Sequence, residues 1–196
     1  IATVLEGEEL EYRLEEPVVR TGFVNAAMVF TIDPDMSPRL APLAWLLGRW
    51  EGAGVVGYPD RESGNFGQEL VATHDGQDYI TWTSRAWMLD EDGRPGEVLA
   101  VESGFWRPEG EDGEFVLLLA HPTGYVEQYF GQRHPERPSI ELATDGILRT
   151  AGAAEYTAAK RLYGLVNGDL MWVMDMAYGG HPMASHMSAQ LKRVEG

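Results

Sequence analysis

Residues 48–54 read Gly48-Arg49-Trp50-Glu51-Gly52-Ala53-Gly54. Alternate side chains of an extended strand point to the same side, so Trp50, Gly52 and Gly54 share one face. A large ring followed by two positions without a side chain leaves inward space that another group can approach. The stretch therefore predicts a strand that carries Trp50 and the glycines of the motif, Gly48, Gly52 and Gly54.

The chain after this stretch alternates short apolar runs with turn signals. Asp-Gly and Asn-Gly pairs favour the positive φ angles of tight hairpins. They occur at Asp75-Gly76, Asp92-Gly93, Asp112-Gly113, Asp145-Gly146 and Asn167-Gly168. The runs between them predict strands at 46–57, 66–74, 78–90, 96–107, 113–121, 124–131, 138–144, 147–151, 156–166, 170–178 and 183–194. A long meander closes into a barrel because closure removes its edges, so we expect an all-β, antiparallel up-and-down barrel of roughly ten strands.

The first part of the chain reads differently. Residues 1–36 are predicted to be an N-terminal extension and residues 37–196 the barrel domain. The extension opens with an acidic stretch and continues into a strand-like run from Gly22 to Ile32. A short helical turn is expected at Leu43 to Leu47, before the first barrel strand. One hypothesis is that the extension covers the barrel mouth and gates it.

Composition narrows the range of partners. The chain has 31 acidic and 15 basic residues and a formal net charge of −16, which repels phosphate backbones. We therefore expect neither nucleic acid nor membrane as a partner, and a single soluble domain that is a monomer or a homodimer. The chain has no cysteine, which excludes disulfides, thiolate metal sites and a thiol nucleophile. This composition fits a reducing compartment, so the expected location is cytoplasmic.

Several motifs, in order, resemble known barrels. The Gly-x-Trp at Gly48 occurs in lipocalin-like barrels, in which an arginine of the last strand stacks on the tryptophan, and Arg193 is placed to do this. The order of motifs is similar to that of the nitrobindin family. The matching segments are Gly48 to Pro59, Phe66 to Glu69 with His74 to Gly76, Glu102 to Pro108, Thr123 to Glu127, and Met176 to Val194.

This resemblance implies a barrel related to fatty-acid-binding proteins and a cofactor inside it. The cofactor is ferric haem b, one per chain, held by a histidine of the last strand that corresponds to His186. Proteins of this family bind nitric oxide and are credited with converting peroxynitrite to nitrate, which would make His186 the catalytic and metal-binding residue. An imidazole is a good axial ligand for iron, and an open position on the metal acts as a Lewis acid.

Strand parity argues against His186 as a ligand. Met187, Ala189 and Leu191 form the apolar face of the last strand, which puts His186 on the other face. The residue can face a cavity only if the strand is irregular after Pro182 or if the residue lies at the rim. The pattern alone favours an exposed rim histidine, whereas the family resemblance favours the ligand.

Other pocket candidates follow from the resemblance. Tyr58, Leu99, His121, Met176 and His181 correspond to positions at or near the cofactor. His121 fits three roles: a distal hydrogen-bond donor, a second axial ligand, or a buried histidine that the backbone satisfies, which is the role we favour.

The chain departs from its relatives at three positions. Leu99-Ala100 replaces a Met-His pair that some relatives carry, and Asp60 follows Tyr58-Pro59 where many have threonine. These departures leave open an alternative in which haem is absent. The same cavity would then carry a fatty acid or another apolar small molecule.

Overall fold

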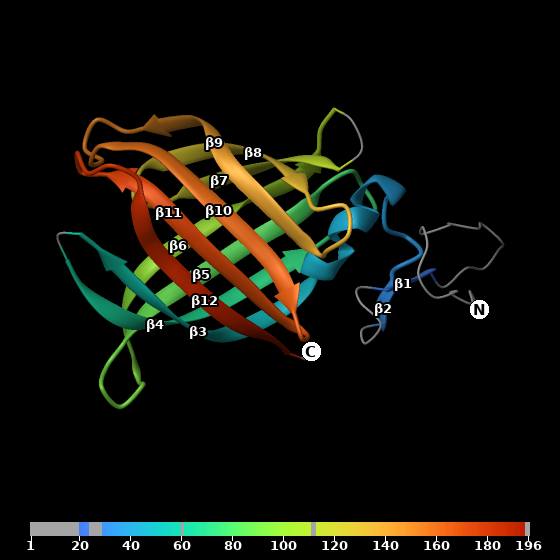
Figure 1. Ribbon diagram of the computed structural model, residues 1–196, viewed down its shortest axis with the longest axis horizontal. Coiled ribbons are helices and arrows are strands. Elements are labelled where there is room, and N and C mark those ends of the chain that lie inside the picture. The colour runs from blue at the N-terminus through green and yellow to red at the C-terminus, as the bar shows by residue number, and fades with distance from the viewer. Residues whose placement is uncertain (1–19, 24–28, 60, 111–112, 195–196) are drawn as a thin grey trace.

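The structure, a computed structural model, describes residues 20–23, 29–59, 61–110 and 113–194. Its described part forms a small hairpin, a 3₁₀ helix and a closed ten-stranded barrel (Figure 1). Each barrel strand pairs antiparallel with its neighbours, and the last strand closes the barrel against the first. The predicted all-β barrel is thus confirmed. The elements are β1 (Arg20–Phe23), β2 (Val29–Ile32), η1 (Pro38–Leu46), β3 (Gly48–Tyr58), β4 (Arg61–Thr73), β5 (Ile80–Leu89), β6 (Pro95–Pro108), β7 (Glu114–His121), β8 (Tyr125–Arg133), β9 (Ser139–Arg149), β10 (Tyr156–Val166), β11 (Asp169–Tyr178) and β12 (Ala184–Val194).

The Asp-Gly and Asn-Gly pairs lie in turns, as predicted, with one exception. Gly76, Gly93, Gly113 and Gly168 have φ angles of 85°, 75°, 90° and 91°, as tight turns require. The Asp145-Gly146 pair does not make a turn, because β9 runs straight through it. Gln128 pairs with Gly146 and Tyr129 with Thr144, so Asp145 is the extra residue of a β-bulge. The predicted strands 138–144 and 147–151 are therefore one strand.

One end of the barrel is closed by η1 and Trp50. Leu40, Leu43 and Leu46 are fully buried, and their spacing of three places them on one face of a 3₁₀ helix. The Trp50 indole donates a hydrogen bond of 2.8 Å to the carbonyl of Leu46. The Arg193 guanidinium lies 4.2 Å from the centre of the Trp50 ring, so the last strand also contributes to this plug.

The space beside the motif glycines is filled, contrary to the expectation. A Cβ atom at Gly52 would lie 2.2 Å from the carbonyl oxygen of Gln190. A Cβ atom at Gly54 would lie 2.1 Å from the carbonyl oxygen of Ser188 and 2.7 Å from the ring of Phe66. These glycines therefore allow β3 and β12 to approach closely where the barrel closes, and no ligand is needed to explain them.

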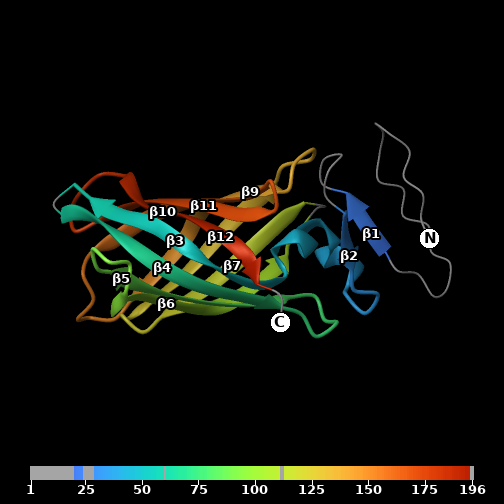
Figure 2. The ribbon, with the colours of Figure 1, turned by 90° about the horizontal axis from the view of Figure 1, so that it is seen from below.

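The described part of the N-terminal segment is a hairpin of β1 and β2. Residues 24–28 of the predicted strand-like run lie outside the described residues. The hairpin lies beside η1, beyond the closed end of the barrel (Figures 1 and 2). Ile32, the last residue of β2, and Met36 are buried against the core. For the described residues, the hypothesis of a gate over the other end of the barrel is therefore wrong.

No helix among the described residues is long and apolar enough to cross a membrane.

Candidate functional site

The end of the barrel opposite η1 carries the candidate site. The hairpins β3–β4, β5–β6, β7–β8, β9–β10 and β11–β12 turn there. Tyr58, Met176 and Met187 retain 7%, 8% and 8% exposure at this end, whereas Trp50 and Leu46 at the closed end retain none. Solvent therefore reaches the inward-facing side chains at this end only slightly, but more than at the plugged end.

Strands β9 and β10 separate toward the open end. Their backbone ladder runs from Gly164 paired with Ser139 to Lys160 paired with Ala143. At the next position, the Thr144 hydroxyl accepts a hydrogen bond of 3.0 Å from the amide of Ala159 and donates one of 3.3 Å to its carbonyl. The threonine side chain thus replaces a ladder pair at the point where the backbone pairing of β9 and β10 ends.

His186 lies on a β-bulge of β12. Met174 of β11 pairs with Met187, but the next residue, Asp175, pairs with Ser185. His186 is therefore the extra residue, and a bulge brings two successive side chains toward the same side of a strand. With this irregularity, strand parity no longer assigns His186 to the outer face. Ala184 packs against the core, Met187 is buried, and His186 between them is partly buried.

The hydrogen bond of His186 determines its tautomer. Its Nδ1 lies 2.9 Å from the carbonyl oxygen of Gly57 on β3. A carbonyl oxygen can only accept, so Nδ1 carries the hydrogen. In the neutral ring the lone pair is then on Nε2, which is the form that binds a metal. Ligating histidines commonly donate their other N–H to a backbone carbonyl in this way.

Tyr58 orders the surroundings of His186. Its hydroxyl accepts a hydrogen bond of 2.8 Å from the amide of Tyr178 and lies 3.1 Å from the carbonyl of Met176, to which it donates. The ring stands edge-on to His181 at 5.5 Å and to His186 at 5.7 Å, measured between ring centres. Tyr58 thus ties β3 to β11 and fixes the position of both imidazoles.

Apolar side chains also lie at this end. Met176 is buried beside Ala184 on the neighbouring strand, and Leu99 and Ala100 are partly buried against the core. The two positions at which this chain departs from some relatives thus present apolar groups. Asp60 lies outside the described residues.

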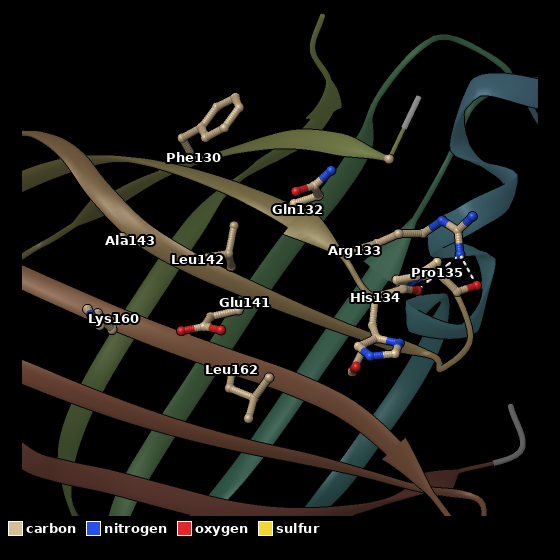
Figure 3. A pocket seen from close by; sticks show the side chains of 12 residues that line it. Phe130, Gln132, Arg133, His134, Pro135, Glu141, Leu142, Ala143, Lys160 and Leu162 are labelled. Carbon is tan, nitrogen blue, oxygen red and sulfur yellow. Dashed lines mark hydrogen bonds between the residues drawn. The ribbon is translucent and has the colours of Figure 1, made fainter. Parts of the chain in front are cut away.

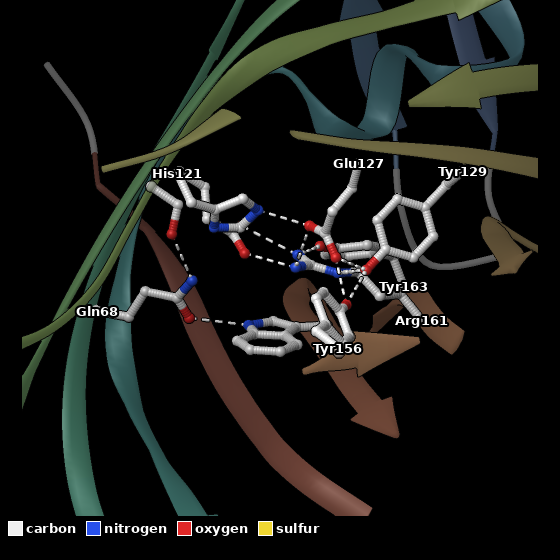
Figure 4. Close-up of polar contacts among 10 residues, drawn as sticks. Gln68, His121, Glu127, Tyr129, Tyr156, Arg161 and Tyr163 are labelled. Atoms are coloured by element: carbon white, nitrogen blue, oxygen red, sulfur yellow. Dashed lines mark hydrogen bonds and ion pairs between the residues drawn. The ribbon is translucent and has the colours of Figure 1, made fainter. Parts of the chain in front are cut away.

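His121 has a partner that the sequence did not reveal. Its Nε2 lies 2.5 Å from Oε2 of Glu127, a carboxylate with no exposed surface (Figure 4). The expectation of a histidine satisfied by the backbone is therefore wrong. The hydroxyls of Tyr129, at 2.7 Å, and Tyr156 also donate to the Glu127 carboxylate.

Arg161 joins these groups from β10. Its guanidinium donates two hydrogen bonds to Glu102, of 3.0 and 2.5 Å, and lies 3.6 Å from Glu127. Burial by itself raises the pKa of Glu127, but the His121 hydrogen bond and the charges of Arg161 and His121 outweigh it and lower that pKa to about 2. Burial raises the pKa of Tyr129 and Tyr156 well above their usual values, so both remain neutral donors.

One subset of this cluster has the spacing of a metal site. Ligand atoms of Glu102, His121 and Glu127 lie within 4.8 Å of one another. The Arg161 guanidinium, however, already contacts both carboxylates and supplies a fixed positive charge where a cation would bind. The arrangement is therefore a buried ion-pair network, in which the guanidinium holds both carboxylates.

Strand alternation indicates that charged residues of this network are buried, but not which residues they pair with. In β8, Tyr125, Tyr129 and Gly131 face inward, and Glu127 shares their parity. In β10, Arg161 lies between the buried residues Ala159 and Tyr163. A charged residue at an inward-facing position requires a buried partner, so the pattern predicts a pairing. The identity of the partners needed the register of the closed barrel.

A separate hollow lies on the outer surface over β8, β9 and β10 (Figure 3). It is open to solvent and has a volume of about 630 Å³. None of the predicted site residues lines it. Its lining includes the outward-facing Phe130, Lys160 and Leu162, so it is distinct from the barrel interior.

Comparisons with known proteins agree with this geometry. The family described as THAP4-like, heme-binding beta-barrel domain matches residues 39–193. A ferric nitrobindin-like protein of Kineococcus radiotolerans is 48% identical, over 85% of this chain and 99% of its own length. A peroxynitrite isomerase of a Nocardioides species is 44% identical over 85% and 99%. The crystal structure of Rv2717c from M. tuberculosis superposes with a TM-score of 0.73 at 30% identity, covering 82% of this chain and 99% of that one. This chain therefore belongs to the nitrobindin family of haem-binding β-barrel domains.

Proposed function

We propose that the open end of the barrel holds one ferric b-type haem with His186 as the axial ligand, and that the chain there converts peroxynitrite to nitrate and binds nitric oxide. The observation that supports this most is the hydrogen bond from Nδ1 of His186 to Gly57. It selects the tautomer with the Nε2 lone pair and holds the ring of a residue that lies on a β-bulge of β12.

The donor set and the lining fit this cofactor. A neutral imidazole is a preferred iron ligand, and Leu99, Ala100 and Met176 offer apolar surface to a flat macrocycle. When bound, the haem would supply an iron with an open coordination position that acts as a Lewis acid toward an anionic oxidant. Isomerisation of peroxynitrite to nitrate conserves atoms and electrons, so the chain needs no external reductant.

The side chains around His186 have supporting roles in this proposal. The Gly57 carbonyl orients the imidazole and increases its basicity. Tyr58 packs edge-on against the ring and prevents it from turning. Met176 and Leu99 limit the access of water, which would compete for the open position. The His181 ring, which also contacts Tyr58 edge-on, completes the mouth of the barrel.

A haem titration tests the proposal. Ferric haem added to haem-free protein should give a saturable Soret shift at one equivalent, and His186→Ala should abolish it. His134→Ala is the matched control, because His134 lies on the β8–β9 connection at the closed end. Stopped-flow decay of peroxynitrite, with nitrate and nitrite quantified, then measures turnover. No saturable shift, or an equal shift in His186→Ala, would contradict the proposal.

The structure gives less support to the alternative in which the haem-free barrel carries a fatty acid. Such a ligand brings a carboxylate, and the buried guanidinium of Arg161 is already matched by Glu102 and Glu127. A third carboxylate near this network would be repelled. Displacement of a fluorescent fatty acid from the same haem-free sample measures this directly. Tight displacement together with absence of haem binding would favour the carrier.

A further inference from the structure

Two tyrosine side chains share one buried carboxylate in the interior of the barrel. The hydroxyls of Tyr129 and Tyr156 both donate to Oε1 of Glu127, over 2.7 Å in the case of Tyr129, and the two hydroxyl oxygens lie 3.2 Å apart (Figure 4). Because burial raises the pKa of Tyr156, its side chain is a neutral phenol. The Glu127 carboxylate, which has no exposed surface, is therefore a base within hydrogen-bond reach of a phenolic proton.

Tyr156 also belongs to a series of aromatic rings in contact. Its ring centre lies 5.5 Å from that of Tyr125 and 6.3 Å from that of Tyr178. The Tyr178 ring lies 6.2 Å from that of Tyr58, which is 5.7 Å from His186. These are the separations of aromatic pairs in contact, and electron transfer between side chains is fastest over such short distances. Tyr178 and His186 are partly exposed, so the series joins the open end of the barrel to Tyr156.

The buried tryptophans have no comparable proton acceptor. The indole N–H groups of Trp82 and Trp106 are buried without a hydrogen-bond partner among the described residues. Trp45 and Trp50 donate to backbone carbonyls, and Trp172 donates to a side-chain amide oxygen. These oxygens are much weaker bases than a carboxylate. An oxidised tryptophan would therefore remain a buried cation, which is costly in the protein interior, so oxidation does not end at these rings.

Arg161 distinguishes the two tyrosines that donate to Glu127. Its guanidinium lies 5.2 Å from the centre of the Tyr129 ring, and its Nε donates a hydrogen bond of 3.1 Å to the Tyr129 hydroxyl. A fixed positive charge at this distance opposes the removal of an electron from that ring. Tyr129 is therefore the harder of the two to oxidise, and an oxidation that reaches the pair ends on Tyr156.

We propose that Tyr156 is a redox-active tyrosine that reduces a small one-electron oxidant, the nitrogen dioxide radical, at the open end of the barrel. The oxidant takes one electron through the ring series and becomes nitrite. The O–H bond of Tyr156 breaks, its proton forms a bond with Oε1 of Glu127, and a neutral phenoxyl radical remains. The choice of nitrogen dioxide rests on the proposed function, because that radical forms when the O–O bond of peroxynitrite breaks homolytically. The assignment of Tyr156 rests on the geometry alone.

The test uses haem-free protein and nitrogen dioxide generated by pulse radiolysis of a nitrite solution. Transient absorption should show a tyrosyl radical that forms as nitrogen dioxide is lost, and freeze-quench EPR should show one tyrosyl signal. Formation should be slower in deuterium oxide, because the phenolic proton moves to Glu127 as the electron leaves. The absence of this isotope effect in the wild type would overturn the proposal without any variant.

Three variants locate the radical. Tyr156→Phe should lose the EPR signal, and Glu127→Gln should form it about a hundredfold more slowly, since a positioned proton acceptor typically contributes that much or more. Tyr79→Phe is the matched control and should equal the wild type, because Tyr79 also donates to a carboxylate, that of Asp75, but lies on the β4–β5 connection at the closed end. A signal that persists in Tyr156→Phe, that Tyr79→Phe removes, or that forms at an unchanged rate in Glu127→Gln would contradict the assignment. Because the readout is a protein radical without haem, failure here is distinguishable from failure of the haem titration.

Discussion

Replacement of Glu127 by glutamine tests whether the buried network stabilises the fold. The pKa of this carboxyl is about 2 in the folded protein, against an ordinary value of 4.5. Because the side chain is fully buried, this difference corresponds to about 3 kcal/mol in favour of the ionised form. Glu127→Gln removes that charge at nearly constant volume, so the free energy of unfolding at pH 7 should fall by about 3 kcal/mol.

The dependence on pH follows from the direction of the shift. A lowered pKa stabilises the fold above the ordinary value of 4.5, and the contribution disappears as the pH falls to about 2. Wild type and Glu127→Gln should therefore differ most at pH 5 to 7, by about 3 kcal/mol, and converge progressively below about pH 4.5.

Urea unfolding followed by tryptophan fluorescence provides the measurement, since the chain has six tryptophans. Glu51→Gln is the control, because its salt bridge with Arg49 is exposed and such pairs contribute about 0–1 kcal/mol. A difference at pH 7 no larger than that of the control would refute the reasoning. So would a difference that stays constant between pH 5 and pH 3.

Three further substitutions test other parts of the fold. Gly54→Ala should lower the free energy of unfolding by roughly 1–3 kcal/mol, because the added methyl group overpacks the contact between β3 and β12. Gly146→Ala, where the space around the Cβ is open, should change the urea midpoint little. Equal effects of the two substitutions would contradict the account of barrel closure. Arg193→Met should lower the free energy of unfolding by about 1–2 kcal/mol, through loss of the contact with Trp50, and an unchanged melting temperature would count against it. Tyr58→Phe should destabilise by about 1–3 kcal/mol and weaken haem binding in the Soret titration, because its hydroxyl joins two strands; wild-type values for both would dismiss that role.

Local signals determine a large part of this fold. The Asp-Gly and Asn-Gly pairs mark hairpins because few residues other than glycine and asparagine adopt positive φ at low cost. Strand alternation and the repetition of hairpins then imply an antiparallel barrel. The plug joins residues far apart in the chain, yet the motifs predict it, since Trp50 and Arg193 belong to the first and last strands, which pair when the barrel closes. The Asp145-Gly146 pair shows the limit of such signals, because a bulge and a turn accept the same residues.

The sequence by itself thus determined the barrel, its closed end and the strand that carries His186. It could not determine on which face His186 lies, because the bulge depends on how β12 pairs with β11. Nor could it match Glu127 with His121 and Arg161, since these residues lie on three strands whose register is set when the barrel closes. Parity is a local property, whereas the pairing of buried charges depends on distances between strands. For that reason only the tertiary structure reveals the network at the open end.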